Sequence, residues 1–279
     1  MARAAGVIAI FARNRFSLAG VFILAAITSV AVTGIWLSPF DPMRSGVGEV
    51  MLPPGAAYLM GTDELGRDIF SRVLAATRTS LGVGICAAAT STAIAVVVGA
   101  LAGFIGGWID DILMRITEIF QVIPRFFLTV LMVALFGASL MNVVLAIAVL
   151  SWPEVARVVR AEVLSLRSRQ FVFAAQVAGA GPVTLIMEEI LPNALGPIIV
   201  NATLQVGQAI LLEAGLSYLG LGDPSTVSLG LMIYQAQEIM RTAWWATAFP
   251  GAFIFLTVVS INLVGDGLND VFNPRSRNR

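Results

Sequence analysis

The chain has 279 residues, of which 58% are hydrophobic and only 12% are charged, and its formal net charge is zero. A soluble domain carries about 25% charged residues, so this composition excludes an ordinary soluble protein, and a neutral chain lacks the basic surface that nucleic-acid binding requires. The chain also has neither His nor Lys; without the commonest metal ligand and the lysine of a Walker A site, we predict no metal site, no catalytic site and no nucleotide bound by this chain.

Six stretches are long and apolar enough to cross a membrane, which takes about 20 residues. They run over Phe16–Leu37, Ser80–Ile105, Ile112–Phe136, Met141–Val159, Ala194–Leu219 and Ala246–Val264. The first follows arginines, as a signal peptide would, but its apolar run exceeds the usual signal-peptide core of about 7–15 residues, so we expect an uncleaved helix. The fold class expected is therefore an all-α membrane protein with six transmembrane helices.

The arginines at or beyond the ends of these stretches predict the orientation, because short cytoplasmic loops carry an excess of Lys and Arg. With the N-terminus inside, the cytoplasmic arginines are Arg3, Arg13, Arg15, Arg157, Arg160, Arg167, Arg169, Arg275, Arg277 and Arg279. The outside loops then hold Arg44, Arg67, Arg72, Arg78 and Arg241. This bias places both terminal segments, 1–15 and 269–279, in the cytoplasm, which six crossings satisfy.

The loop 38–79, expected outside, is too long for a simple connection between helices. It begins with several prolines and then becomes polar around Gly61, Thr62, Asp63, Gly66, Arg67 and Asp68. Thr62 or Asp63 is a candidate cap for a short helix whose arginines pair with Asp68 or Glu64. Two interpretations stay open: a solvated cover over the helix ends, or a gate for substrate.

The loop 160–193, expected inside, contains an amphipathic segment with a patch of small residues. Ala174, Ala175 and Ala178 allow close approach of a partner, and Gly179 and Pro182 are expected to end the helix. The pattern indicates a helix that docks onto another protein, and the alternative is a helix lying on the membrane surface.

Arg125 and Glu213 stand out among the few charged residues within the predicted spans, where charge is costly unless it faces a cavity or a partner. Arg125 follows Pro124 in the third span, and we expect it to pair with Glu118 or with a group on another chain. Glu213 lies in the fifth span. Both are candidates for a pathway or gate, and structural pairing is the alternative for each.

At the loop 160–193 the chain resembles the integral membrane subunits of ABC importers. Their signature is E-A-A-x3-G followed by I-x-L-P. Phe173–Gly179 matches the first part with Phe173 in place of Glu, and Ile190–Leu191–Pro192 matches the second without the residue between Ile and Leu. The chain also resembles the "C" type permeases of the dipeptide, oligopeptide and nickel group, at three further places. These are Met60–Asp68, Glu213–Gly222, and Gly265–Asp270 followed by Asn273–Pro274–Arg275.

The resemblance implies a type I ABC importer permease fold, with a core over 80–268, in a bacterial inner membrane. It implies a second homologous permease, two cytoplasmic ATPase subunits that bind ATP and magnesium, and an extracytoplasmic solute-binding protein as partners, besides membrane lipid. The ATPase-coupling residues that it implies are Phe171, Phe173, Ala174, Ala175, Ala178, Gly179, Ile190, Leu191 and Pro192.

The function expected is that of a permease subunit for peptides or similar small solutes, in which closure of the ATPases moves the loop 160–193 and tilts the helices. The competing hypothesis is a secondary transporter or channel without an ATPase partner. Such a protein would need ion-coupling groups in its spans, and few charged residues lie there.

Overall fold

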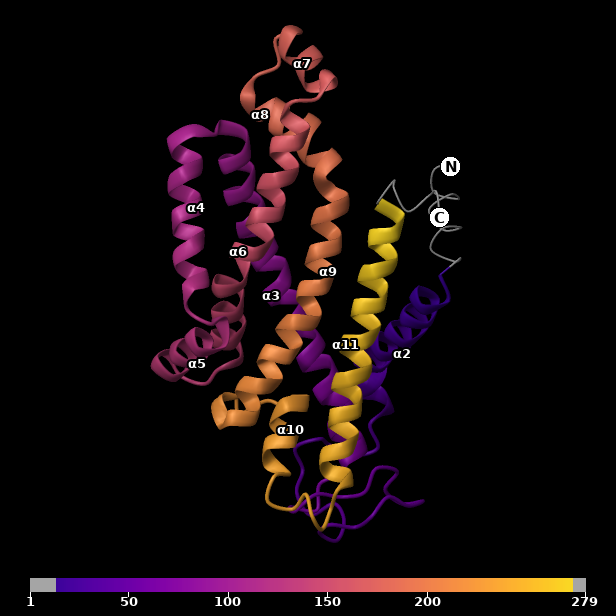
Figure 1. The fold of residues 1–279 in the computed structure, drawn as a ribbon. Helices are drawn as coiled ribbons and strands as arrows, with labels where there is room; N and C mark the ends of the chain where they lie inside the picture. The colour runs from indigo at the N-terminus through magenta and orange to yellow at the C-terminus, as the bar shows by residue number, and fades with distance from the viewer. Residues whose placement is uncertain (1–13, 273–279) are drawn as a thin grey trace.

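The computed structural model describes residues 14–272, and within this range it contains helices and no strand (Figure 1). The helices are α2 (Arg15–Leu37), α3 (Ile69–Ile105), α4 (Gly107–Val122), α5 (Arg125–Phe136), α6 (Leu140–Arg167), α7 (Gln170–Val177), α8 (Pro182–Thr184), α9 (Leu191–Leu216), α10 (Leu229–Gln235) and α11 (Trp245–Phe272). Two π-helical turns, η1 (Leu185–Ile190) and η2 (Ser217–Leu221), flank α9.

Five helices or continuous helical segments of the described chain are long and apolar enough to span a membrane, and α4 with α5 makes a sixth, broken span. The predicted all-α membrane fold is confirmed, with five spans, or the expected six when the bent pair of α4 and α5 is counted as one span. The third span, expected as one helix over 112–136, is instead bent by 82° between α4 and α5. Pro124 causes the break, because it lacks an amide hydrogen and forces Ile123 into extended backbone with ψ 133°.

The second span begins well before its expected start at Ser80. The Asp68 carboxylate accepts hydrogen bonds from the amide and the hydroxyl of Ser71, at 2.8 and 2.6 Å, and so caps α3 at Ile69. The expectation that Thr62 or Asp63 would cap a helix is wrong, because Asp68 takes that position and Asp63 is occupied by arginines. The membrane helix therefore extends directly into the polar end of the 38–68 loop.

Helix α3 lies at the centre of the bundle and packs against α6, α9 and α2, while α11 packs against α9 and α2. Small residues let α3 and α6 approach closely. A Cβ added at Gly99 would lie 2.5 Å from the carbonyl oxygen of Ala156, and one at Gly103 would lie 2.8 Å from that of Arg160. Such contacts between backbones are typical of membrane helices, where packing replaces the hydrophobic effect.

The bundle has two distinct ends (Figure 1). Helices α7 and α8 project at one, the α7 end, and α10 lies with the 38–68 loop at the other, the α10 end. The start of α2 lies beside the end of α11, since Asn14 Nδ2 donates to Asp270 at 3.2 Å. Gly196, in the first turns of α9, faces Phe272. Both ends of the described chain thus lie toward the α7 end.

Parts of the sequence predictions lie outside the described residues. These are most of the terminal segments 1–15 and 269–279, the motif Asn273–Pro274–Arg275, and Arg3, Arg13, Arg275, Arg277 and Arg279.

Candidate functional site

The loop 160–193 folds as α7, α8 and η1 at the projecting end of the bundle (Figure 1). Val172 of α7 is buried and belongs to one apolar cluster with Leu185, Ile190 and Val163 of α6, and Ala175 packs against this cluster. On the opposite side of α7, Phe173 is 67% exposed and Val177 is 81% exposed. Helix α7 is therefore fixed to the bundle by one face and presents an apolar second face outward.

Gly179 ends this helix as predicted. Its φ of +90° is a left-handed conformation that favours glycine. The amide of Ala180 donates to the carbonyl of Ala175, and the amide of Gly179 donates to that of Gln176, each at 3.0 Å, which is the Schellman pattern of a helix C-terminus. The chain then turns sharply, and Pro182 begins α8.

The residues expected to couple to an ATPase divide between surface and interior. Phe171, Phe173, Ala174, Ala178 and Gly179 are exposed on or beside α7. Ile190 is fully buried, so it fixes the segment from inside, while Leu191 and Pro192 begin α9. The exposed set, together with Val177, is called the α7 face below.

A bidentate ion pair that the sequence did not predict braces the helix leading to α7. Arg160 of α6 donates from Nε and Nη2 to the two carboxylate oxygens of Asp110 in α4, each at 2.5 Å. Near the end of α6, the Arg167 guanidinium lies 6.0 Å from the centre of the Phe104 ring. These contacts join α6 to α4 and α3 close to the α7 end.

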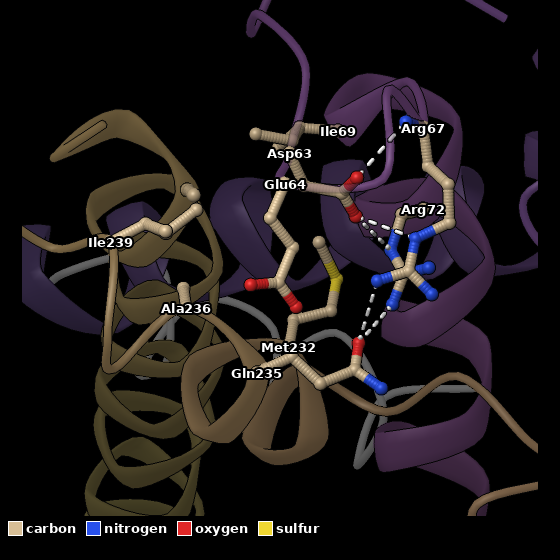
Figure 2. Close-up of a pocket in the computed structure, with 10 residues that line it drawn as sticks. Asp63, Glu64, Arg67, Ile69, Arg72, Met232, Gln235, Ala236 and Ile239 are labelled. Carbon is tan, nitrogen blue, oxygen red and sulfur yellow. Dashed lines mark hydrogen bonds and ion pairs between the residues drawn. The ribbon is translucent and has the colours of Figure 1, made fainter. Parts of the chain in front are cut away.

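At the α10 end, buried charges join the 38–68 loop to two helices (Figure 2). Asp63 Oδ2 lies 2.6 Å from Arg67 Nε and 3.8 Å from Arg72 Nε. Gln235 of α10 accepts from Nη2 of Arg72 at 2.7 Å and from Nη2 of Arg67 at 3.2 Å. These four residues are called the outer clasp below.

The outer clasp corrects the predicted pairing of the arginines with Asp68 or Glu64. Asp68 caps α3, so its carboxylate is taken, and Asp63 lies between the two guanidiniums instead. The clasp itself is buried, with Arg72 only 2% exposed, whereas most of residues 38–60 are exposed, and the two interpretations of the loop as a cover or a gate stay predictions. Gly61 and Gly66 have positive φ, and Thr62 accepts a hydrogen bond through its carbonyl from the Trp245 indole at 3.2 Å. Gln235 and α10 were missed, although Ser228 before an apolar run is a helix-capping signal.

Glu213 lies in the interior rather than on an open face, and it is 2% exposed. Its carboxylate accepts from the hydroxyl of Ser217 at 2.7 Å and from that of Ser80 at 3.3 Å, and Ser80 also accepts from the amide of Leu229. The carboxylate thus connects α9 to α3 and α10. This position favours the structural alternative for Glu213 over pathway lining.

Arg125, the other candidate for a pathway or gate, is the first residue of α5. Its Nη1 lies 3.6 Å from Glu154 Oε2 of α6, and its Nη2 donates to Gln208 of α9 at 3.1 Å. The expected partner Glu118 was wrong: it pairs with Arg115 at 3.0 Å, because the bend at Pro124 carries Arg125 away from α4. Glu154 was missed, although an acidic residue beside Pro153 within a predicted span was a visible signal.

Asp223, in the loop before α10, accepts a hydrogen bond from the first residue of α6. Its carboxylate accepts from the hydroxyl and the amide of Ser225 and from the amide of Leu140. The Ser225 hydroxyl, followed by the Leu140 amide, holds the pKa of Asp223 below its ordinary value. The loop before α10 is therefore attached to the α5–α6 connection.

Residues 95–278 match the family described as binding-protein-dependent transport system inner membrane component. Residues 5–54 match the N-terminal transmembrane domain of oligopeptide transport permease C. The two matches together cover most of the chain and leave residues 55–94 between them, and the match over 95–278 includes the α7 face and α4 to α11.

Curated relatives match nearly the full length. The di/tripeptide transport system permease protein of Pseudomonas aeruginosa is 38% identical, over 96% of this chain and 91% of its own. The dipeptide transport system permease protein of Bacillus subtilis is 40% identical, over 95% of this chain and 83% of its own length. The nickel transport system permease protein of Escherichia coli is 38% identical, over 95% of this chain and 96% of its own length.

Among solved structures, an inward-facing form of the MetNI methionine ABC transporter contains a chain with a TM-score of 0.61 and 20% identity. The match covers 72% of this chain and 96% of that one. At this identity the likeness shows a shared fold.

Proposed function

The chain belongs to the family of binding-protein-dependent transport system inner membrane components, as a C-type permease subunit of an ABC importer, and we propose that it forms half of a pathway for peptides or related small solutes. Three of its relatives carry di/tripeptides, dipeptides or nickel by name. The other half of the pathway is a second, homologous permease, to which an extracytoplasmic solute-binding protein delivers substrate.

The observation that carries this proposal is the α7 face. Val177 and Phe173 are exposed apolar side chains on a helix that projects from the bundle and is rigidly fixed to it. An exposed apolar patch on a braced element is typical of a docking surface. Two ATPase subunits, one for each permease, bind at such faces, and they hold the ATP and magnesium. This chain needs no nucleotide site, in keeping with its lack of Lys.

The proposed orientation has the α7 end in the cytoplasm of the bacterium and the α10 end outside. Arg167 and Arg169 lie directly before α7, and Arg157 and Arg160 lie in the half of α6 that leads to it, so basic residues gather on the proposed cytoplasmic side. The ends of α2 and α11 lie toward the same side. Both termini are then cytoplasmic.

Force passes from the ATPases to the pathway through short, stiff connections. Helix α6 runs into α7 with a two-residue link, and η1 continues directly into α9. Because the Asp110–Arg160 pair joins α6 to α4, movement of α7 tilts these helices as one packed unit. ATP drives the tilt since it binds the closed ATPase pair more tightly than the open one.

Reconstitution of the complete transporter in proteoliposomes tests this function. We expect uptake of labelled alanyl-alanine only when ATP, both ATPase subunits and the loaded binding protein are present. The second permease and the ATPases should also purify with this chain. Uptake at the same rate by this chain without ATPase subunits would favour the secondary transporter or channel instead.

A further inference from the structure

A group of polar side chains surrounds a cavity of about 370 Å³ at the bend between α4 and α5. Its lining includes Gln121, Arg125, Glu154 and Arg157. Glu154 lies near the middle of α6, about 20 Å from either end at a rise of about 1.5 Å per residue. The cavity therefore lies part-way along α6, between Glu154 in the predicted span and Arg157 near its cytoplasmic end, where charges are expensive unless they face water or a polar partner.

Two hydrogen-bond donors at this cavity have no acceptor among the described residues. They are Nη1 of Arg125 and Nε2 of Gln121, both buried. Nη1 is 3.6 Å from the Glu154 carboxylate, which is within ion-pair range but beyond a hydrogen bond. Buried donors in proteins almost always have partners, so this pair calls for an acceptor from outside the chain.

The charges indicate the chemistry of that acceptor. Arg125 and Arg157 contribute two positive charges and Glu154 one negative charge, which leaves an excess of positive charge around the cavity. Arg125 is also the first residue of α5, so the positive end of that helix dipole lies here. A guanidinium offers paired donors that match the two oxygens of a carboxylate.

The groups that already contact Arg125 lie at the surface of this chain. The Glu154 side chain is 56% exposed, and Gln208, which holds the other nitrogen of Arg125, is also exposed. The cavity therefore opens on the face of the chain that carries these polar groups. A liquid water occupies about 30 Å³, so this volume admits the charged end of a small peptide together with several waters.

We propose that this cavity binds the terminal carboxylate of a peptide in transit, with the Arg125 guanidinium and the Gln121 amide as its donors. The inference rests on the proposed function, and it specifies the substrate class of the pathway as solutes with a free carboxylate. Glu154 keeps the site weak by repelling the same carboxylate, which allows the solute to leave.

Direct binding to the complete transporter in nanodiscs, without the binding protein, tests the site. Tritiated alanyl-alanine is the probe, and alanyl-alaninamide is the competitor that lacks the carboxylate. We expect Arg125→Gln and Gln121→Leu to weaken alanyl-alanine binding, by about tenfold for the arginine, with little change for the amide. Glu154→Gln should act in the opposite sense and tighten alanyl-alanine binding.

Arg115→Gln is the matched control, since Arg115 lies on α4 with its side chain 80% exposed and away from the cavity, and it should bind alanyl-alanine as the parent does. Equal binding of the amide and the free peptide by the parent, or unchanged discrimination in Arg125→Gln, would overturn the site. If Arg125→Gln loses the second permease while peptide binding persists, the acceptor is a carboxylate of that permease and the inference is wrong.

If Arg125→Gln does not assemble, alanyl-alanine binding by Glu154→Gln decides instead. Binding that is equal to or weaker than that of the parent overturns the site. Failure of the inference is distinguishable from failure of the proposed function. A parent complex that imports alanyl-alanine with ATP but shows no carboxylate preference keeps the function and loses the site.

Discussion

Phe173→Asp is expected to abolish ATP-driven uptake and to release the ATPase subunits from the membrane complex. Phe173 is an exposed apolar residue of the α7 face. Burial of a Phe side chain is worth about 1.5–3 kcal/mol, and an unpaired carboxylate in its place adds a desolvation cost. At about 1.4 kcal/mol for each factor of ten, we expect retention of the ATPases to fall about 100-fold or more. The amount of ATPase subunit that co-purifies with this chain in detergent measures this retention.

Two companion variants show that the loss comes from the α7 face. Phe173→Leu keeps an apolar side chain and should retain the ATPases and most of the uptake. Ser168→Asp adds the same negative charge in the link before α7, at an exposed position, and should also assemble. Normal uptake and a full complement of ATPase subunits in Phe173→Asp would remove α7 from the docking surface.

The second large effect is expected at the outer clasp. Asp63→Asn leaves the buried guanidiniums of Arg67 and Arg72 without the carboxylate between them. Removing one partner of a buried ion pair costs about 3–5 kcal/mol, because the remaining charge stays buried and uncompensated. We therefore expect a clearly lower unfolding temperature for the detergent-purified chain, measured by tryptophan fluorescence.

Glu64→Gln is the control for this prediction. Glu64 is next in sequence and lines the same small cavity, but it forms no ion pair among the described residues. The Glu64→Gln variant should unfold at the same temperature as the parent chain. If Asp63→Asn is as stable as Glu64→Gln, the clasp does not hold the 38–68 loop to α3 and α10.

The spans and the end of α7 could be predicted from the sequence because local signals set them. Apolar length fixes which segments enter the membrane, and Gly179 followed by Pro182 fixes where α7 stops. Pro124 was visible too, but a proline within an apolar stretch is compatible with either a kink or a break. The neighbours of α5 decide between these, and hydropathy carries no information about them.

The pairing of side chains between helices was the part that the sequence did not predict. Arg125 has possible partners on its own helix by spacing, yet it meets Glu154 and Gln208 from two other helices. Arg67 likewise pairs with an aspartate four residues before it, because the loop turns at Gly66 rather than continuing as a helix. Such choices depend on how separate segments pack.

The orientation of α7 is tested most directly by labelling single cysteines with a membrane-impermeant maleimide in intact spheroplasts. The background is Cys86→Ser, which removes the one native thiol, and the test variants are Ala178→Cys beside α7 and Ala56→Cys in the 38–68 loop, both at exposed positions. We predict that Ala56→Cys is labelled from outside. Ala178→Cys should react only after the membrane is opened, and bound ATPase subunits should protect it. Labelling of Ala178→Cys in intact spheroplasts would place α7 outside the cell and contradict the ATPase-docking role.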